Sequence, residues 1–338
     1  MKTLFSSPIG PTNVILRNSL AWRRTAAAGL LLIAGVVAAA AQAHLNPGDI
    51  VYLGSASIVK VDPQTGQATF ICQGGLLGNF GYSVGVVVDR AGQLIIANRG
   101  CLLRLDPDTC EQTLIRDAQD APGFFSGIAL DQDGSLLVAA EAGILRVNPD
   151  TGAMRVISSG GFFTQALSLA VGKHGELFVI NNRFEAAGGG WVGEIIRVHP
   201  QNGQQKLIAR GGYLNYLQGI AVAGDDIYVT GMATQDKRLW VGRVTHVDAR
   251  TGAQRLVSQD GRLVCPVGIA VNETGRLIVA DPFTMSALSL DPFAGAIIGV
   301  EPATGAQMLV MDAGAYWSPV LNPCGVALVP SLVPSRKR

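Results

Sequence analysis

The feature of this 338-residue chain that most restricts its fold is a turn phrase that occurs six times. Its fullest forms are IVKVDPQTGQATFI from Ile58, ILRVNPDTGAMRVI from Ile144 and IIRVHPQNGQQKLI from Ile195. Successive copies are 42 to 53 residues apart, and a repeat of this length in a strand-rich chain predicts a propeller or a similar array. The six turns begin at Asp62-Pro63, Asp106-Pro107, Asn148-Pro149, His199-Pro200, Asp248-Ala249 and Glu301-Pro302.

Each copy of the phrase has the pattern of a β-hairpin. From Ile144 to Asn148, successive side chains fall alternately on the two faces of a strand, and this period of two residues is typical of a half-buried strand. A proline at the second place of the turn fixes φ, and a later glycine supplies a positive φ. The chain therefore reverses into a second strand.

A second phrase recurs between these hairpins, as in GIALDQDGSLLVAA from Gly127 and GIAVNETGRLIVAD from Gly268. It also predicts two strands joined by a tight turn. Two hairpins in each repeat make a four-stranded antiparallel sheet, and six such sheets around an axis make a six-bladed β-propeller. The predicted fold class is all-β.

The two ends of the repeat region are expected to meet in one blade. GVALVP, from Gly325, resembles the first strand of a blade and then stops, while GDIVYLG, from Gly48, resembles the second strand. The last blade is therefore predicted to be closed by N-terminal strands pairing with the C-terminal strand. The propeller domain spans residues 44–330, residues 331–338 form a basic tail, and no helical period is present after residue 44.

The first 43 residues have the pattern of a targeting segment. Four basic residues precede the apolar run TAAAGLLLIAGVVAAAAQA, which ends in Ala41-Gln42-Ala43. This arrangement predicts a secretory signal peptide and export to the periplasm or the extracellular space. The alternative is an uncleaved N-terminal anchor, because the run is about long enough to span a bilayer. This segment is the only contact with a membrane that the sequence predicts.

The two phrases resemble the NHL-repeat family of six-bladed propellers, and more distantly the SMP-30/gluconolactonase family, over residues 48–330. The resemblance implies the fold more specifically than the function, because the shared motif is mostly strand and turn chemistry. The SMP-30 resemblance implies a metal-dependent hydrolase with Glu, Asn and Asp ligands, some of them immediately before the innermost strand. The residues at that place contain no carboxylate, which disfavours this activity: Val84, Ser126, Leu167, Gln218, Val267 and Cys324.

Strands a, b, c and d denote the order within a blade from the axis to the rim. Strand b ends with an oxygen-bearing side chain in alternate repeats, and Glu141 follows the end of another. Oxygen ligands that converge on the axis suit Ca²⁺ or a similar divalent cation. The alternative is that these side chains cap turns by bonding local backbone. The candidate metal ligands are Asn98, Glu141, Asn181 and Asp281.

The b–c and d–a connections lie on one face, and three of the b–c connections are long: residues 183–194, 232–243 and 282–296. Long loops on a rigid scaffold commonly carry binding residues, and aromatic side chains gather in these. The alternative is that the aromatic residues pack the loops against one another. The candidate binding face consists of Arg183, Phe184, Trp191, Gln218, Trp240, Phe283 and Trp317.

Charge and cysteine content narrow the function classes. The net charge is +1 and charged residues make up 15% of the chain, so no basic face predicts nucleic-acid binding.

The five cysteines are an odd number, and Cys265 and Cys324 are expected near the mouth of the central funnel, either bridged or as buried thiols. We therefore expect an exported binding or scaffold protein that recognises a small molecule, a carbohydrate or a protein, with a metal-dependent hydrolase as the alternative.

Overall fold

The computed structural model describes residues 44–331, apart from residues 55, 80–82, 187–189, 236–238, 284–294 and 314–322. The predicted signal segment, residues 1–43, and nearly all of the basic tail lie outside this part of the chain. Within the described residues, no helix is both long enough and apolar enough to cross a membrane.

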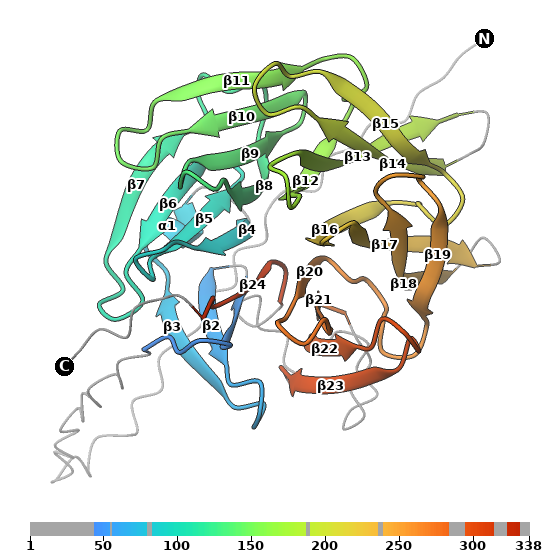
Figure 1. Cartoon of the computed structure of the whole chain (residues 1–338). Helices are drawn as coiled ribbons and strands as arrows, with labels where there is room; N and C mark the ends of the chain where they lie inside the picture. Colours follow the sequence, from blue (N-terminus) through green and yellow to red (C-terminus); the bar gives the residue numbers. More distant parts are fainter. Residues whose placement is uncertain are drawn as a thin grey trace, which may run out of the picture. The chain divides into compact units, whose positions relative to one another are not determined.

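In the described part of the chain, twenty-four strands form six separate four-stranded antiparallel sheets. Figure 1 shows these sheets as blades around a central axis, in the order of the colour bar. Each innermost strand contacts the innermost strands of the two neighbouring blades, so the ring is closed. The prediction of an all-β, six-bladed propeller with four-stranded antiparallel blades is confirmed.

The blades are numbered from the N-terminal end, and their strands run from a to d. Blade 1 contains β24 (Val326–Leu328), β1 (Ile50–Leu53), β2 (Ser57–Val61) and β3 (Ala68–Gln73). Blade 2 contains β4 (Ser83–Val88), β5 (Leu94–Asn98), β6 (Cys101–Leu105) and β7 (Gln112–Asp117). Blade 3 contains β8 (Phe125–Leu130), β9 (Leu136–Ala140), β10 (Gly143–Val147) and β11 (Met154–Ser159).

The second half of the ring follows the same plan. Blade 4 contains β12 (Ala166–Val171), β13 (Leu177–Glu185), β14 (Gly190–Val198) and β15 (Gln205–Arg210). Blade 5 contains β16 (Leu217–Ala223), β17 (Asp226–Gln235), β18 (Leu239–Asp248) and β19 (Gln254–Gln259). Blade 6 contains β20 (Gly268–Val271), β21 (Leu277–Asp281), β22 (Ala296–Val300) and β23 (Gln307–Asp312).

Blade 1 closes the ring with strands from both ends of the chain. Ile50 of β1 pairs with Leu328 of β24, and Tyr52 pairs with Val326. The Leu53 amide also donates to the Gly325 carbonyl at 2.9 Å. In Figure 1 the dark red β24 accordingly lies beside the blue strands of the same blade. The predicted pairing of the two chain ends is confirmed.

The apolar core lies between the blades, not within one sheet. Strands β5 and β9 read LIIAN and LLVAA, and all of their residues are buried, because neighbouring blades cover both faces of a b strand. Leu137 and Ile144 of blade 3 pack in one cluster with Leu177 and Ile196 of blade 4. Each fully buried side chain of this size contributes about 1.5–3 kcal/mol relative to exposure.

The glycine of the repeated turn is required for two reasons. Gly203 has a φ of 71°, a conformation that disfavours side chains with a Cβ. A Cβ on Gly203 would also lie 2.1 Å from the Ile157 carbonyl oxygen of the preceding blade. The turn phrase that identifies the repeat is therefore also a point of contact between blades.

A glutamine at the start of strand d forms hydrogen bonds with the d–a connection that follows the preceding blade. Gln205 Oε1 accepts a hydrogen bond from the Phe162 amide at 2.8 Å, and Gln205 Nε2 donates to the Gly160 carbonyl at 3.1 Å. Similar bonds between a strand d glutamine and the preceding connection are made by Gln112, Gln254 and Gln307. These bonds join residues 35 to 47 positions apart in the chain.

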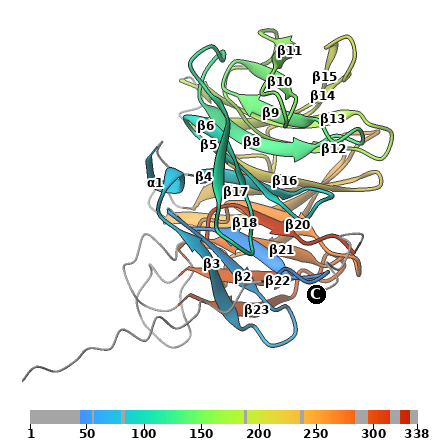
Figure 2. The same ribbon diagram turned by 90° about the vertical axis from the view of Figure 1, so that its left-hand side faces the viewer.

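Two sequence-based expectations about local structure need correction. The short helix α1 (Leu76–Asn79), visible beside β4 and β5 in both ribbon views, lies in a part of the chain where no helix was expected (Figure 2). The long b–c connections of blades 4 and 5 are largely strand, because β13–β14 pairing continues to Glu185 and Gly190 and β17–β18 pairing continues to Gln235 and Leu239. Unbroken cross-strand pairing explains this extension. Most of the third connection lies outside the described residues.

Candidate functional site

The face that carries the b–c and d–a connections, called the loop face below, bears an aromatic cluster on the extended hairpin of blade 4. Phe184 of β13 lies directly opposite Trp191 of β14 in the strand register. Their ring centroids are 5.4 Å apart and the rings meet edge to face. Cross-strand aromatic pairs of this kind stabilise a hairpin and hold both rings in place. Phe184 is nevertheless 59% exposed.

The cluster continues onto the connection between blades 4 and 5. Tyr216 packs edge to face on Trp191, with 6.0 Å between the ring centroids. Tyr216 has a φ of 42°, which is unusual for a bulky residue and costs about 1–3 kcal/mol. The surrounding structure therefore holds the backbone in a strained conformation at the residue that extends the aromatic cluster.

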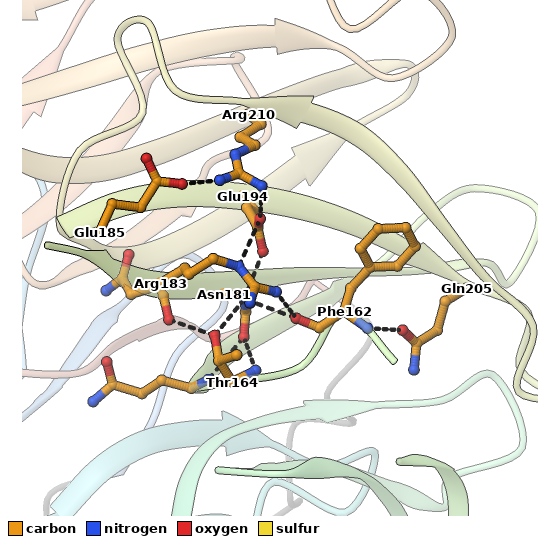
Figure 3. A network of polar contacts seen from close by, with 10 residues as sticks. Phe162, Thr164, Asn181, Arg183, Glu185, Glu194, Gln205 and Arg210 are labelled. Carbon is orange, nitrogen blue, oxygen red and sulfur yellow. Dashed lines mark hydrogen bonds and ion pairs between the residues drawn. The ribbon is translucent and has the colours of Figure 1, made fainter. Parts of the chain in front are cut away.

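A buried carboxylate lies on the same hairpin as this cluster. Glu194 of β14 is fully buried and accepts hydrogen bonds from Asn181 Nδ2 at 2.7 Å and from Arg183 Nε at 3.3 Å. It also forms an ion pair with an Arg210 guanidinium nitrogen at 3.1 Å. Arg210 also pairs with Glu185 at the surface. Figure 3 shows the two arginines and Asn181 converging on Glu194 from β13 and β15. A buried charge is tolerated only when it is paired and hydrogen-bonded in this way.

The same network anchors the connection between blades 3 and 4. Asn181 Oδ1 accepts bonds from the Thr164 and Gln165 amides, both at 2.9 Å. The Phe162 carbonyl accepts from Arg183 at 3.0 Å and from Asn181 at 3.2 Å, while its amide donates to Gln205 (Figure 3). The backbone that presents the Phe162 ring is thus fixed on both sides.

Asp281 and Asn98 occupy the equivalent position at the end of strand b in blades 6 and 2. Asp281 Oδ2 accepts from the Val264 and Cys265 amides at 2.8 and 3.0 Å, and Asp281 Oδ1 accepts from the Phe283 amide at 3.0 Å. Asn98 Nδ2 donates to the Leu77 carbonyl at 3.3 Å. Burial raises the pKa of Asp281 to about 6, although the three backbone donors favour its charged form. In alternate blades the end of strand b therefore holds the d–a connection.

Three of the four predicted metal ligands make these backbone contacts. Asn98, Asn181 and Asp281 are fully buried, and the capping expected of them is directed mainly at a connection about 16–21 residues earlier in the chain. Glu141 lies one residue beyond β9 and packs against Gly123. In the described part of the chain, no group of three or more His, Cys, Asp or Glu side chains could hold a metal ion. A calcium site stays a prediction.

Gln218 lies apart from the aromatic cluster. It occupies a β-bulge in β16 and lines an axial channel of about 350 Å³ that is bounded by the innermost strands. The other polar side chains along this channel are Ser168 and Cys324, and no charged side chain among the described residues lines it. Most of the lining is aliphatic side chain and strand backbone, so the channel offers no acid or base from the described residues.

The remaining predicted residues of the binding face are only partly described. Phe283 is 37% exposed and follows the Asp281 anchor. Trp240 lies on β18 opposite Thr234, and its side chain, like all of Trp317, lies outside the described residues. Of the neighbouring aromatic pairs, Phe124 and Phe162 are exposed, whereas Phe125 and Phe163 are buried. The loop face therefore exposes part of its aromatic set and buries the rest.

The exposed aromatic residues of the described chain are unevenly distributed. All but Phe70, which lies on the outermost strand β3, belong to connections or hairpins of the loop face. In the described residues, the a–b and c–d turns of the opposite face expose no large hydrophobic side chain. The exposed aromatic residues of the loop face are Phe124, Phe162, Phe184, Tyr213 and Phe283.

The cysteines differ from the sequence-based expectation. Cys72 and Cys110 form a disulfide between the outer edge of blade 1 and the c–d turn of blade 2, a pairing that the spacing did not reveal. Cys265 and Cys324 are thiols, so the bridge considered for them is not formed. Burial raises the pKa of Cys265 to about 12 and of Cys324 to about 11, and both thiols are therefore poor nucleophiles.

Sequence reasoning also missed Glu194 and the glutamines of strand d. The sequence places Glu194 at the end of a long connection, and its significance comes from its burial beside two arginines. The glutamines do have a sequence signal, because Gln254 and Gln307 each follow a T-G-A turn, and Gln112 and Gln205 hold the same place in their repeats.

No protein-family model matches the sequence, and a search of curated proteins finds no match. A chain in the crystal structure of a nidogen/laminin complex superposes on this protein with a TM-score of 0.63. The alignment covers 84% of this chain and 98% of that chain, at 13% sequence identity. An identity this low supports the propeller fold alone.

Proposed function

We propose that this protein is an exported binding scaffold whose partner is another protein, and that the partner docks on the loop face at blades 4 and 5. The observation that carries the proposal is the fixed aromatic cluster of Phe184, Trp191 and Tyr216, in which Phe184 is exposed and the other two rings are half-buried. Aromatic side chains dominate the binding energy of protein interfaces, and rigid ones lose little conformational freedom on binding.

The energetic design of the site supports this proposal. The Glu194 network and the strained Tyr216 backbone restrict surface residues that contribute little to the core. Such restriction is expected where a surface is preorganised for a partner. The similar propeller in the nidogen/laminin complex comes from a protein assembly, which agrees with a protein partner but does not identify one.

Two further observations support export and the repeat type. The Cys72–Cys110 disulfide is typical of an oxidising compartment, in agreement with a signal peptide at residues 1–43. The GIAVNETGRLIVAD lines and the D-P-x-T-G turns are similar to NHL repeats, and we extend that similarity to this propeller as a proposal.

The proposal is tested with Phe184→Ala and its control Phe70→Ala. Phe184 and Phe70 are 59% and 51% exposed, but only Phe184 lies on the loop face. Tagged full-length protein is isolated from its host after chemical cross-linking, and a co-purifying protein is then purified and titrated against each variant. Phe184→Ala is expected to weaken binding by about 2 kcal/mol, or roughly 30-fold, and Phe70→Ala by less than threefold.

Two results would argue against the loop face. Binding that survives Phe184→Ala and Trp191→Ala unchanged would place the contact elsewhere. Equal losses from Phe184→Ala and Phe70→Ala would indicate a nonspecific apolar interaction. Circular dichroism of each variant separates both results from a failure to fold.

A further inference from the structure

A second cleft lies on the face opposite the aromatic cluster, at the edge of blade 4. It has a volume of about 430 Å³ and is lined by Glu176, Arg197, His199, Gln204 and Lys206, among others. Arg197 of β14 and Lys206 of β15 are directly opposite in the strand register. Two like charges at such positions repel each other and destabilise the strand pair.

Neither cation has a carboxylate partner among the described residues. This distinguishes blade 4 from four other blades, in which the equivalent strand c residue contacts an aspartate side chain. Those pairs are Lys60 with Asp49, Arg104 with Asp150, Arg146 with Asp131 and Asp133, and His246 with Asp226.

The sequence explains why Arg197 lacks such a partner. The position that Asp131 occupies in the a–b turn of blade 3 is Gly172 in blade 4. The position that Asp150 occupies in the c–d turn facing Arg104 is Arg250 in the turn of blade 5. Both of these positions therefore lack an aspartate, and one of them carries a further cation. The position that Asp226 occupies beside His246 in blade 5 is Glu176 in blade 4, but no ion pair joins Glu176 to Arg197 among the described residues.

Glu176 is the one acid among the described residues that line the cleft, and its carboxylate accepts a hydrogen bond within its own turn. Glu176 Oε2 accepts a hydrogen bond from the His174 amide at 3.0 Å. The carboxyl group also rests against Gly172, since a Cβ there would lie 2.6 Å from Glu176 Cδ. Arg197 and Lys206 consequently face the cleft with an excess of positive charge.

We infer that this cleft binds an oxyanion, namely a phosphate or sulfate group. A guanidinium presents two parallel donors to such a group, and an ammonium adds a mobile point charge. His199 Nδ1 accepts from the Gln201 and Asn202 amides at 3.4 Å, which leaves Nε2–H as a third donor of the neutral ring. The bound anion also relieves the repulsion between Arg197 and Lys206. This site is independent of the proposed partner surface.

Calorimetric titration of the full-length protein with inorganic phosphate tests the inference, at a constant ionic strength set with chloride. Saturable binding is expected, and Arg197→Gln is expected to weaken it about tenfold or more, because a charge-assisted bond is lost. Lys173→Gln is the matched control. It removes one positive charge from the same blade, but Lys173 is already paired with Asp225 at 2.9 Å.

Sedimentation with phosphatidylglycerol vesicles forms the second arm and distinguishes the source of the phosphate. Binding of inorganic phosphate that depends on Arg197 supports a free anion. Vesicle binding with the same dependence, in the absence of phosphate binding, supports a lipid headgroup. The inference is overturned if neither probe binds saturably, or if Arg197→Gln and Lys173→Gln weaken binding equally while both variants keep the wild-type melting temperature.

Discussion

Replacement of Glu194 by Gln removes the charge at the centre of the loop-face network while keeping the shape of the side chain. Glu194 is fully buried, whereas the side chains of Arg183 and Arg210 are 31% and 42% exposed. Water can therefore solvate the arginines in the variant, and the loss is smaller than for a completely buried ion pair. The variant loses two charge-assisted contacts and keeps one acceptor oxygen, which gives a destabilisation of about 2 kcal/mol.

Urea unfolding followed by tryptophan fluorescence measures this loss, because Trp191 lies on the same hairpin. Glu185→Gln is the control. Its carboxylate is bonded to the same Arg210 but is 35% exposed, so a loss of less than about 0.5 kcal/mol is expected. If the urea midpoint of Glu194→Gln shifts while the dependence of its unfolding free energy on urea concentration stays unchanged, stability alone has changed. Equal losses in the two variants would refute the argument that burial makes Glu194 the anchor of the network.

Two further predictions concern the anchors of the d–a connections. Burial raises the pKa of Asp281 to about 6, so the folded state binds a proton more tightly than the unfolded chain, and the stability that this proton adds is present below pH 4 and lost as the pH rises to 6. The melting temperature of Asp281→Asn should therefore increase relative to that of the wild type across this range. A constant difference between the two melting temperatures would contradict the raised pKa. Gln205→Ala should lower the free energy of unfolding by about 1–2 kcal/mol, because the hydrogen bonds of Gln205 to Phe162 and Gly160 are lost. The control Gln204→Ala, at the exposed neighbouring residue, should have little effect. Equal urea midpoints for the two variants would exclude a role of Gln205 in joining the blades.

The architecture was predictable because its signals are local. A period of two residues in strands such as Ile144 to Val147, together with a proline and a glycine in each turn, specifies a hairpin without knowledge of distant contacts. The repetition of these hairpins then predicts the blades. Closure of the ring was also predictable, because each chain end carries only part of a blade.

The candidate site was less predictable because its contacts join distant parts of the chain. The sequence places Phe184 and Trp191 in one connection, but it does not reveal that β13 and β14 continue pairing through them. Glu194 acquires its role only when Arg183 and Arg210 meet it in the folded blade. The Cys72–Cys110 bridge crosses between blades in the same way, and no local spacing identifies it.

The central claim, that a protein partner docks on the loop face, is tested most directly by site-specific photo-cross-linking. A photoreactive p-benzoylphenylalanine replaces Phe184 in one sample and Phe70 in another, and the full-length proteins are irradiated in their native host. Cross-linking of the same discrete partner at position 184, with none at position 70, is the predicted result. Cross-linking at position 70 alone, or at neither position although both proteins are folded, would contradict the claim.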